Sequence, residues 1–189
     1  MIESPADLFR RRFDGTRSAL TSLERQVDDL VEIATTIAAS LENGGTLFTA
    51  GNGGSAAQAL HLAEELVGRY RTDRPPLAAV CLNADPTALT CIANDFGYEQ
   101  VFARPIEALG RTGDVLCVLT TSGRSANLVK ALDVARATGV TTIGLLGGDG
   151  GDCAALCDRA IVIEGGDSAH IQEAHLVALH LVCEAMETA

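Results

Sequence analysis

A histidine and a glutamate four residues apart form the first pair of side chains in this sequence that could do chemistry. His61 and Glu65 lie in a long helical pattern, so both side chains project from one face of the same predicted helix. An imidazole and a carboxylate at this spacing can share a divalent metal ion or divide the work of proton transfer. A solvated His–Glu pair on an amphipathic helix has the same spacing, so the pair alone does not establish a site.

The helix that carries this pair opens on a glycine-rich turn. An apolar stretch from Leu47 leads into the turn Gly51–Gly54, GNGG, and Ser55 begins the helical pattern. Such a turn between a strand and a helix N-terminus lets bare backbone N–H groups approach an anion closely. The stretch therefore predicts an anion site on the helix that carries the His–Glu pair.

A second polar turn follows a later apolar stretch. Val115–Thr120 runs into the residues TSGRS at 121–125, and a helical pattern, ANLVKALDVARATG, comes next. Hydroxyl groups, a glycine and Arg124 at one helix N-terminus suit a phosphate monoester. A cluster of Ser and Thr that only caps the helix has the same composition, and that alternative stays open. A third polar junction, NDFG at 94–97, follows another predicted helix.

The chain from Thr46 onward alternates between apolar stretches and helical patterns. The predicted strands are Thr46–Ala50, Leu77–Leu82, Asp114–Thr120, Thr141–Leu146 and Ala160–Glu164. The predicted helices are Ser55–Tyr70, Pro86–Asn94 with a continuation over Tyr98–Leu109, Ser125–Thr138, and Gly151–Cys157. Because the strands are apolar throughout rather than alternating, they indicate a parallel sheet covered on both faces. The predicted fold class is α/β, a doubly wound three-layer sandwich with a five-stranded parallel sheet, preceded by N-terminal helices. The first two polar turns would then face one crevice at the carboxyl ends of the strands.

Residues 1–44 form the predicted N-terminal helical segment. Its helical pattern runs from Pro5 to Leu41, with Ser4 as the cap and Gly15 as the expected break between two helices. The apolar stripe is wide for a surface helix, so we assign the segment to packing, including packing between subunits.

The C-terminal helical pattern runs from His170 to Met186 and is apolar on nearly every side. Such a helix is expected to be buried, here within an oligomer. Gln172 and His180 need polar partners there, which favours a role in a site; histidines bonded to backbone carbonyls in the core are the simpler alternative. The two residues are about 12 Å apart along an ideal helix. They could bind one metal ion only if it lay between them or if Gln172 sat in an irregular first turn; otherwise different subunits contribute to each site.

The composition is that of an acidic globular protein. At 189 residues the chain (1–189) is long enough for one domain, with residues 45–189 as the α/β core and C-terminal helix. Its formal net charge of −11 argues against a nucleic-acid surface. No apolar run approaches ~18 residues and no signal-peptide core is present, so we expect no membrane association. The six cysteines, most of them within apolar stretches, are typical of buried thiols in a reducing compartment, and the expected location is the cytoplasm.

With these residues in view, the sequence resembles the SIS (sugar isomerase) domain proteins, and most closely the bacterial phosphoheptose isomerases. The resemblance covers nearly the whole chain. The stretches that carry it are AGNGGSAAQALHLAEELVGRY, NDFGYEQVFARPIEALGR, TTSGRSANLVKAL and IQEAHLVALH. The SGxS turn marks only the broad SIS group, which includes non-enzymatic sugar-phosphate sensors. The combination of GNGGS with His61, Glu65, Gln172 and His180 is far more specific.

The resemblance implies a ketose–aldose isomerase that converts sedoheptulose 7-phosphate into an aldoheptose 7-phosphate, either D-glycero-D-manno-heptose 7-phosphate or an epimer. It also implies a homotetramer with active sites at subunit interfaces, and one zinc ion per subunit. The implied zinc ligands are His61, Glu65, Gln172 and His180. The implied phosphate loop is Thr120, Thr121, Ser122 and Ser125, and the implied sugar contacts are Asn52, Gly53, Gly54, Ser55, Asn94, Asp95 and Gln172.

The chemistry of such a reaction suits these residue types. Aldose–ketose isomerisation needs a base that moves a proton between adjacent carbons and a second group that moves protons on the oxygens. Glu65 is the expected carbon base, acting through a cis-enediol, and His180 is the expected group at the oxygens or in ring opening. A metal ion or hydrogen-bond donors would stabilise the enediolate.

The alternative is a SIS protein without catalysis, either a sugar-phosphate sensor or a partner-binding relative. The metal-and-base set argues against it, because a pure binder does not need one. The chain departs from the family pattern in two places: Ala169-His170 stand where Asp-Arg is common, and Arg124 stands where Asn is usual. Either change could alter the product epimer or the sugar that fits. A dinucleotide-binding turn is not favoured, because the spacing G-x-G-x-x-G is absent.

Overall fold

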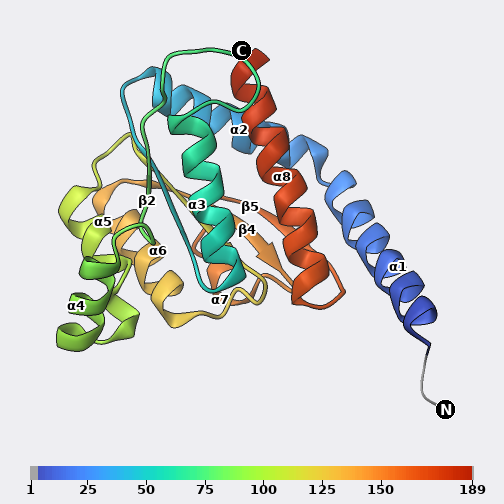
Figure 1. Cartoon of the computed structure of the whole chain (residues 1–189). Coiled ribbons are helices and arrows are strands. Elements are labelled where there is room, and N and C mark those ends of the chain that lie inside the picture. The colour runs from blue at the N-terminus through green and yellow to red at the C-terminus, as the bar shows by residue number, and fades with distance from the viewer. Residues whose placement is uncertain (1–3, 189) are drawn as a thin grey trace.

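Five parallel strands form one sheet in the computed structural model, which describes residues 4–188 (Figure 1). The strand order is β2-β1-β3-β4-β5, and every neighbouring pair is parallel. The strands are β1 (Leu47–Gly51), β2 (Ala79–Cys81), β3 (Val115–Thr120), β4 (Thr141–Gly147) and β5 (Arg159–Ile163). The predicted five-stranded parallel sheet is confirmed, and no strand end differs from the prediction by more than two residues.

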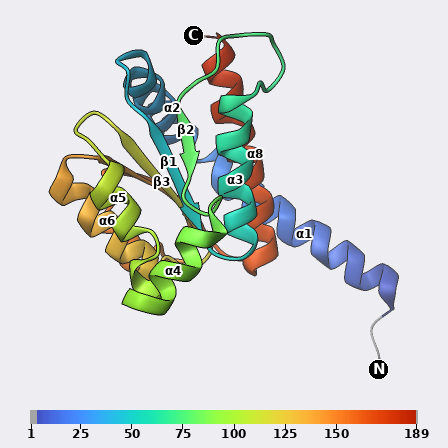
Figure 2. The ribbon, with the colours of Figure 1, turned by 60° about the vertical axis from the view of Figure 1, so that its left-hand side comes forward.

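Helices cover both faces of this sheet, as Figure 2 shows from the side. One buried cluster joins the sheet to α1 (Pro5–Glu24), α2 (Val27–Glu42), α3 (Gly54–Val67) and α8 (Ser168–Thr188). A second cluster on the other face involves α4 (Pro86–Phe96), α5 (Ala103–Leu109), α6 (Ala126–Thr138) and α7 (Gly151–Ala154), and the 3₁₀ turn η1 (Tyr98–Gln100) links α4 to α5. Both faces of the central strands β1 and β3 are buried, which is why these strands read as unbroken apolar runs. The doubly wound three-layer sandwich is therefore confirmed.

The direction of winding reverses between β1 and β3. These two strands are neighbours although β2 lies between them in the chain, and their pairing places Gly51 opposite Leu119. Ligands of such sheets bind at this switch point, outside the carboxyl ends of the strands. The pairing therefore brings the two polar turns together at one edge of the sheet.

The first helix contradicts the prediction of a break at Gly15. Ser4 caps α1 as predicted, with Pro5 at the first helical position, but the helix then continues to Glu24. The break lies at Arg25–Gln26, where the Gln26 side chain makes two hydrogen bonds with the backbone of the edge strand: Nε2 donates to Val162 O (2.8 Å) and Oε1 accepts from Val162 N (2.9 Å). The chain turns there because the amide of Gln26 covers part of the edge of the sheet.

Gly15 is needed for packing instead. A Cβ atom at this position would lie 2.3 Å from Cε1 of His170, whose ring is buried at the start of α8. Thr16 donates a hydrogen bond to Glu173 (2.5 Å), and Arg12 forms an ion pair with Asp167, so the middle of α1 is fastened to the first turn of α8. The first turns of α1 extend away from the rest of the chain in both views (Figures 1 and 2).

His175 is the histidine that bonds to a backbone carbonyl in the core, through one of its two ring nitrogens. Its Nε2 lies 3.0 Å from Leu146 O at the end of β4, and it is fully buried. Burial lowers the pKa of His175 to about 4, against the opposing effect of its hydrogen bond to Leu146, so the ring is neutral near pH 7.

No helix within residues 4–188 combines the length and apolar character that a membrane crossing requires.

We predict that Gly15→Ala lowers the free energy of unfolding of the wild type but raises that of a His170→Ala variant. Alanine normally stabilises a helix interior by about 1 kcal/mol over glycine. Beside His170 the added methyl overpacks the contact, so Gly15→Ala should destabilise the chain by about 1–2 kcal/mol. In a His170→Ala background the same change should stabilise it. Urea unfolding of the four proteins measures the coupling; equal effects of Gly15→Ala in both backgrounds would contradict the packing role of Gly15.

Candidate active site

A small polar cavity lies where the turns after β1 and β3 meet. Its volume is about 90 Å³, far below that of a pocket that encloses a whole small ligand and suited to one phosphate group. It is lined by Asn52, Ser55, Leu119, Thr120, Thr121, Ser122, Ser125 and Gln172. The structure thus brings together seven of the eleven residues that the sequence suggested for substrate binding.

The N-termini of two helices point at this cavity. Ser55 is in the first turn of α3, and Ser125 is the cap of α6. Each helix N-terminus carries unpaired backbone N–H groups and a partial positive charge, which favours an anion between them. Thr120 Oγ1 accepts hydrogen bonds from Gly123 N (3.2 Å) and Ser122 N (3.4 Å), which leaves its own proton free to be donated.

The remaining predicted contacts lie around the cavity rather than in its lining. Gly54 faces Gln172, because a Cβ atom on this glycine would lie 2.6 Å from Nε2 of that side chain. Gly53 caps α3 with a positive φ of 56°. Asn94 and Asp95 are exposed at the end of α4, where Asn94 Nδ2 donates to Asp95 Oδ1 (2.7 Å).

Arg124, one of the two departures from the family pattern, points away from the cavity. Its Nη2 donates to Asp149 Oδ2 (2.6 Å) on the loop after β4, and its Nη1 donates to Ser122 O (3.0 Å). The hydrogen bond from Arg124 holds the pKa of Asp149 at about 2, helped by a second bond from Gly151 N. Gly123 packs directly on Gly150, whose carbonyl oxygen would be 1.8 Å from a Cβ atom there. Arg124 therefore connects the loop after β3 to the loop after β4.

His61, Glu65 and His180 form a second polar group further along the same helices. His61 Nε2 lies 3.0 Å from Glu65 Oε1, and the ring of His180 meets that of His61 edge-on with centroids 5.2 Å apart. One potential ligand atom from each residue lies within 4.8 Å of the other two, and no other such group of three occurs within residues 4–188. The side chains of His61 and Glu65 are 35% and 15% exposed, so the group is reachable from solvent. The ring of Tyr70 lies 5.6 Å from that of His180 and covers one side of it.

The helices α3 and α8 set the separation between the cavity and this group. They lie side by side in both views and run in the same direction, because Gly54 meets Gln172 at one end and His61 meets His180 further on (Figures 1 and 2). Gln172 and His180 are eight residues apart on α8, which is about 12 Å along the helix axis. The structure therefore places Gln172 with the cavity and His180 with His61 and Glu65.

Several side chains that support the site were not found from the sequence. Asn83 makes two hydrogen bonds with Gly51, the last residue of β1. Its Oδ1 accepts from Gly51 N (3.2 Å), and its Nδ2 donates to Gly51 O (3.0 Å). Asn127 and Tyr98 both bond to the side chain of Asn52. The only signal for Asn127 was a polar residue in the first turn of α6, which is equally typical of a capping residue.

A parallel sheet of this order, with a small polar cavity at its switch point, is a doubly wound α/β domain of the kind that binds ligands at this edge. The family model of the SIS domain matches residues 13–147. A phosphoheptose isomerase from Helicobacter pylori (strain P12) is 43% identical over 182 residues, which span 96% of this chain and 95% of that protein. A phosphoheptose isomerase from Streptomyces coelicolor is 53% identical over 153 residues, or 81% of this chain and 66% of the relative. The solved phosphoheptose isomerase from Neisseria gonorrhoeae superposes with a TM-score of 0.93 at 36% identity, covering 98% of this chain and all of the other. The chain belongs to the phosphoheptose isomerase family of SIS-domain proteins.

Proposed function

We propose that this protein is a ketose–aldose isomerase that converts sedoheptulose 7-phosphate into an aldoheptose 7-phosphate. The observation that carries the proposal is the presence of a phosphate-sized cavity and an imidazole–carboxylate group on the same two parallel helices, in a chain of the phosphoheptose isomerase family. The cavity would hold the phosphate, and the rest of the sugar would extend along α3 and α8.

The separation of the two parts of the site suits a long sugar. The carbon chain of an open heptose spans about 8 Å when extended, before the phosphate ester adds its own length. The cavity and the His–Glu group are separated by about two helical turns, or ~11 Å along the helix axis. Because helical side chains lean toward the N-terminus, those of His61 and Glu65 reach back toward the cavity and shorten this distance. A sugar phosphorylated at C7 can therefore place C1 and C2 beside Glu65.

We assign the proton transfers to two side chains. Glu65 would remove a proton from C1 of the open ketose, which gives a cis-enediol, and would return a proton to C2 to give the aldose. His180 would move protons between the two oxygens or assist ring opening. Both residues are partly buried, which strengthens their electrostatic influence on a bound sugar.

We predict that Glu65→Gln abolishes turnover while the fold stays intact, because a carboxamide cannot accept the carbon-bound proton. Sedoheptulose 7-phosphate in deuterated water, followed by NMR, should give with the wild type an aldoheptose 7-phosphate with deuterium at C2. The rate should fall at least ~100-fold in Glu65→Gln. Glu64→Gln, which changes the exposed neighbour on α3, is the matched control and should stay active. A wild type that binds the sugar phosphate without conversion or exchange would establish the sensor instead.

The donor set of the second polar group fits a zinc ion. Two imidazoles and a carboxylate, with ligand atoms within 4.8 Å of one another, are a common zinc-binding combination. We propose one zinc ion per subunit, bound by His61, Glu65 and His180. Gln172, the fourth ligand suggested by the family, lines the cavity in this structure, so its side chain would have to turn toward the ion to bind it. When bound, the ion would act as a Lewis acid on the oxygens of the sugar.

Removal of zinc should therefore stop catalysis reversibly. We expect one zinc per chain by elemental analysis, loss of turnover after chelation, and recovery when zinc is restored. His180→Ala should lower the zinc content well below one per chain, whereas the control Glu64→Gln should keep it. A metal-free wild type with full activity would exclude the zinc site.

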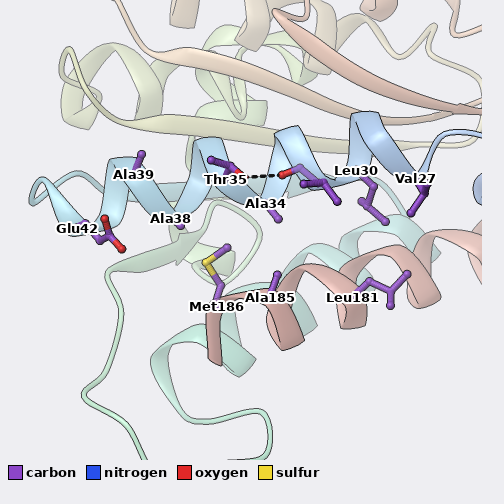
Figure 3. A pocket seen from close by; sticks show the side chains of 11 residues that line it. Val27, Leu30, Ala34, Thr35, Ala38, Ala39, Glu42, Leu181, Ala185 and Met186 are labelled. Atoms are coloured by element: carbon purple, nitrogen blue, oxygen red, sulfur yellow. Dashed lines mark hydrogen bonds between the residues drawn. The ribbon is translucent and has the colours of Figure 1, made fainter. Parts of the chain in front are cut away.

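We also propose that a second copy of the chain packs on the apolar groove between α2 and α8, within a homotetramer. The groove has a volume of about 410 Å³, and Figure 3 shows apolar side chains from both helices along it. Its lining residues are Val27, Leu30, Val31, Ala34, Thr35, Ala38, Ala39, Glu42, Leu181, Ala185 and Met186. Val31 and Leu181 are 59% and 44% exposed in the single chain, and Phe9 and Phe13 stand exposed on the projecting part of α1. These features support the assignment of residues 1–44 to subunit packing. The placement of the active sites at subunit interfaces rests on the family resemblance alone.

Charge in this groove should dissociate the oligomer. We predict that Val31→Asp lowers the mass measured by light scattering from that of a tetramer and reduces turnover with it. Leu109→Asp places a charge on an equally exposed leucine at the end of α5 and should leave the mass unchanged. A tetramer that persists in Val31→Asp would overturn the placement of the interface.

We place the protein in the cytoplasm. All six cysteines are free thiols, which is typical of proteins in a reducing compartment. Recovery of the protein in an extracellular or periplasmic fraction would contradict this location.

A further inference from the structure

The side chain of Asn52 is held from two other segments of the chain. Its Nδ2 donates to Asn127 Oδ1 (3.0 Å), and its Oδ1 accepts from Asn127 Nδ2 (2.9 Å), so the two amides pair reciprocally. The hydroxyl of Tyr98 also donates to Asn52 Oδ1 (2.9 Å). These contacts connect the turn after β1 with the first turn of α6 and with η1.

The hydrogen bonds determine which part of the Asn52 amide remains for a ligand. A carboxamide oxygen has two lone pairs, and here one is used by Asn127 and the other by Tyr98. The amide nitrogen has two N–H groups, of which one is used by Asn127. Asn52 also lines the small cavity. The amide therefore has one N–H group left to donate and no acceptor left.

The burial of Asn127 makes this orientation costly to change. Asn127 is only 3% exposed, and both of its side-chain hydrogen bonds go to Asn52. A flip of one amide alone would oppose donor to donor and acceptor to acceptor in a buried place, which is strongly unfavourable. A flip of both amides together would keep the reciprocal pair but would lose the hydrogen bond that the Tyr98 hydroxyl donates to Asn52 Oδ1, so Tyr98 selects between the two arrangements. Tyr98 approaches from the solvent side and donates to the same oxygen.

We propose that Asn127 and Tyr98 are positioning residues that make Asn52 a hydrogen-bond donor only, directed at an oxygen of the substrate phosphate. The proposal rests on the proposed function, since it takes the cavity to be the phosphate site. A phosphate dianion offers only acceptor oxygens, so a donor-only amide matches it and discriminates against a ligand that presents a hydroxyl proton at this point. Asn52 thereby complements the hydroxyl and backbone donors of the turn after β3.

The test compares inorganic phosphate binding and turnover in Asn127→Ala, Tyr98→Phe and a control. Asn127→Ala frees the Asn52 amide to rotate, so the dissociation constant of inorganic phosphate, measured by calorimetry, should rise about 10-fold. The KM for the sugar phosphate should rise in parallel, while kcat changes less than about 3-fold. Tyr98→Phe removes one of the three bonds and should raise both constants by a smaller factor, about 2–4-fold. Asn43→Ala removes an asparagine that bonds only to Ala39 O at the end of α2, and should change neither constant.

The outcomes separate the positioning role from others. Unchanged phosphate binding and KM in folded Asn127→Ala and Tyr98→Phe would overturn the proposal, as would a fall in kcat with KM unaltered. Tyr98→Phe keeps the test decisive if Asn127→Ala fails to fold, because the Tyr98 side chain is largely exposed. Inorganic phosphate binding needs no turnover, so a wild type that binds phosphate but converts no sugar would refute the isomerase and leave this proposal to be judged by the binding constants.

Discussion

The pairing of β1 with β3 is the contact on which the rest of the site depends. The two strands are not consecutive in the chain, yet their register places Gly51 opposite Leu119 and so ends both strands at the same level. The polar turns that follow then share one small cavity, and the N-termini of α3 and α6 contribute their partial positive charges to it. A chain with a net charge of −11 can in this way offer a local site for an anion without a surplus of basic residues.

The parallel course of α3 and α8 adds the second half of the site. α3 starts at the first polar turn, so every residue along it lies at a distance from the cavity that the helix geometry fixes. α8 runs beside it in the same direction, and Gly54 allows the close contact with Gln172 that sets their relative position. His180 consequently meets His61 and Glu65 two turns beyond the cavity. The distance between the cavity and the His61, Glu65 and His180 group is thus set by two packed helices rather than by a loop.

Local patterns predicted most of this architecture, and long-range contacts account for what they missed. The Ser4–Pro5 cap, the apolar strands and the His61–Glu65 pair depend on neighbouring residues, so they could be found from spacing alone. Gly15 was misread as a helix break because glycine lowers helix propensity, whereas its role is set by His170, more than 150 residues away. Asn127 shows the same limit: its burial and its reciprocal bonds with Asn52 exist only once β1 and β3 are paired.

The two departures from the family pattern act away from the cavity lining. Arg124 reaches Asp149 on the next loop, and His170 packs on Gly15 of α1, so each fastens one element to another. Neither side chain lines the cavity or belongs to the His61, Glu65 and His180 group. The Arg124–Asp149 ion pair is exposed to solvent, so screening leaves it only a small contribution to stability, and its structural effect is to connect the loops after β3 and β4. Within one chain, an effect of either residue on the sugar would therefore pass through the position of the loop or helix that it holds.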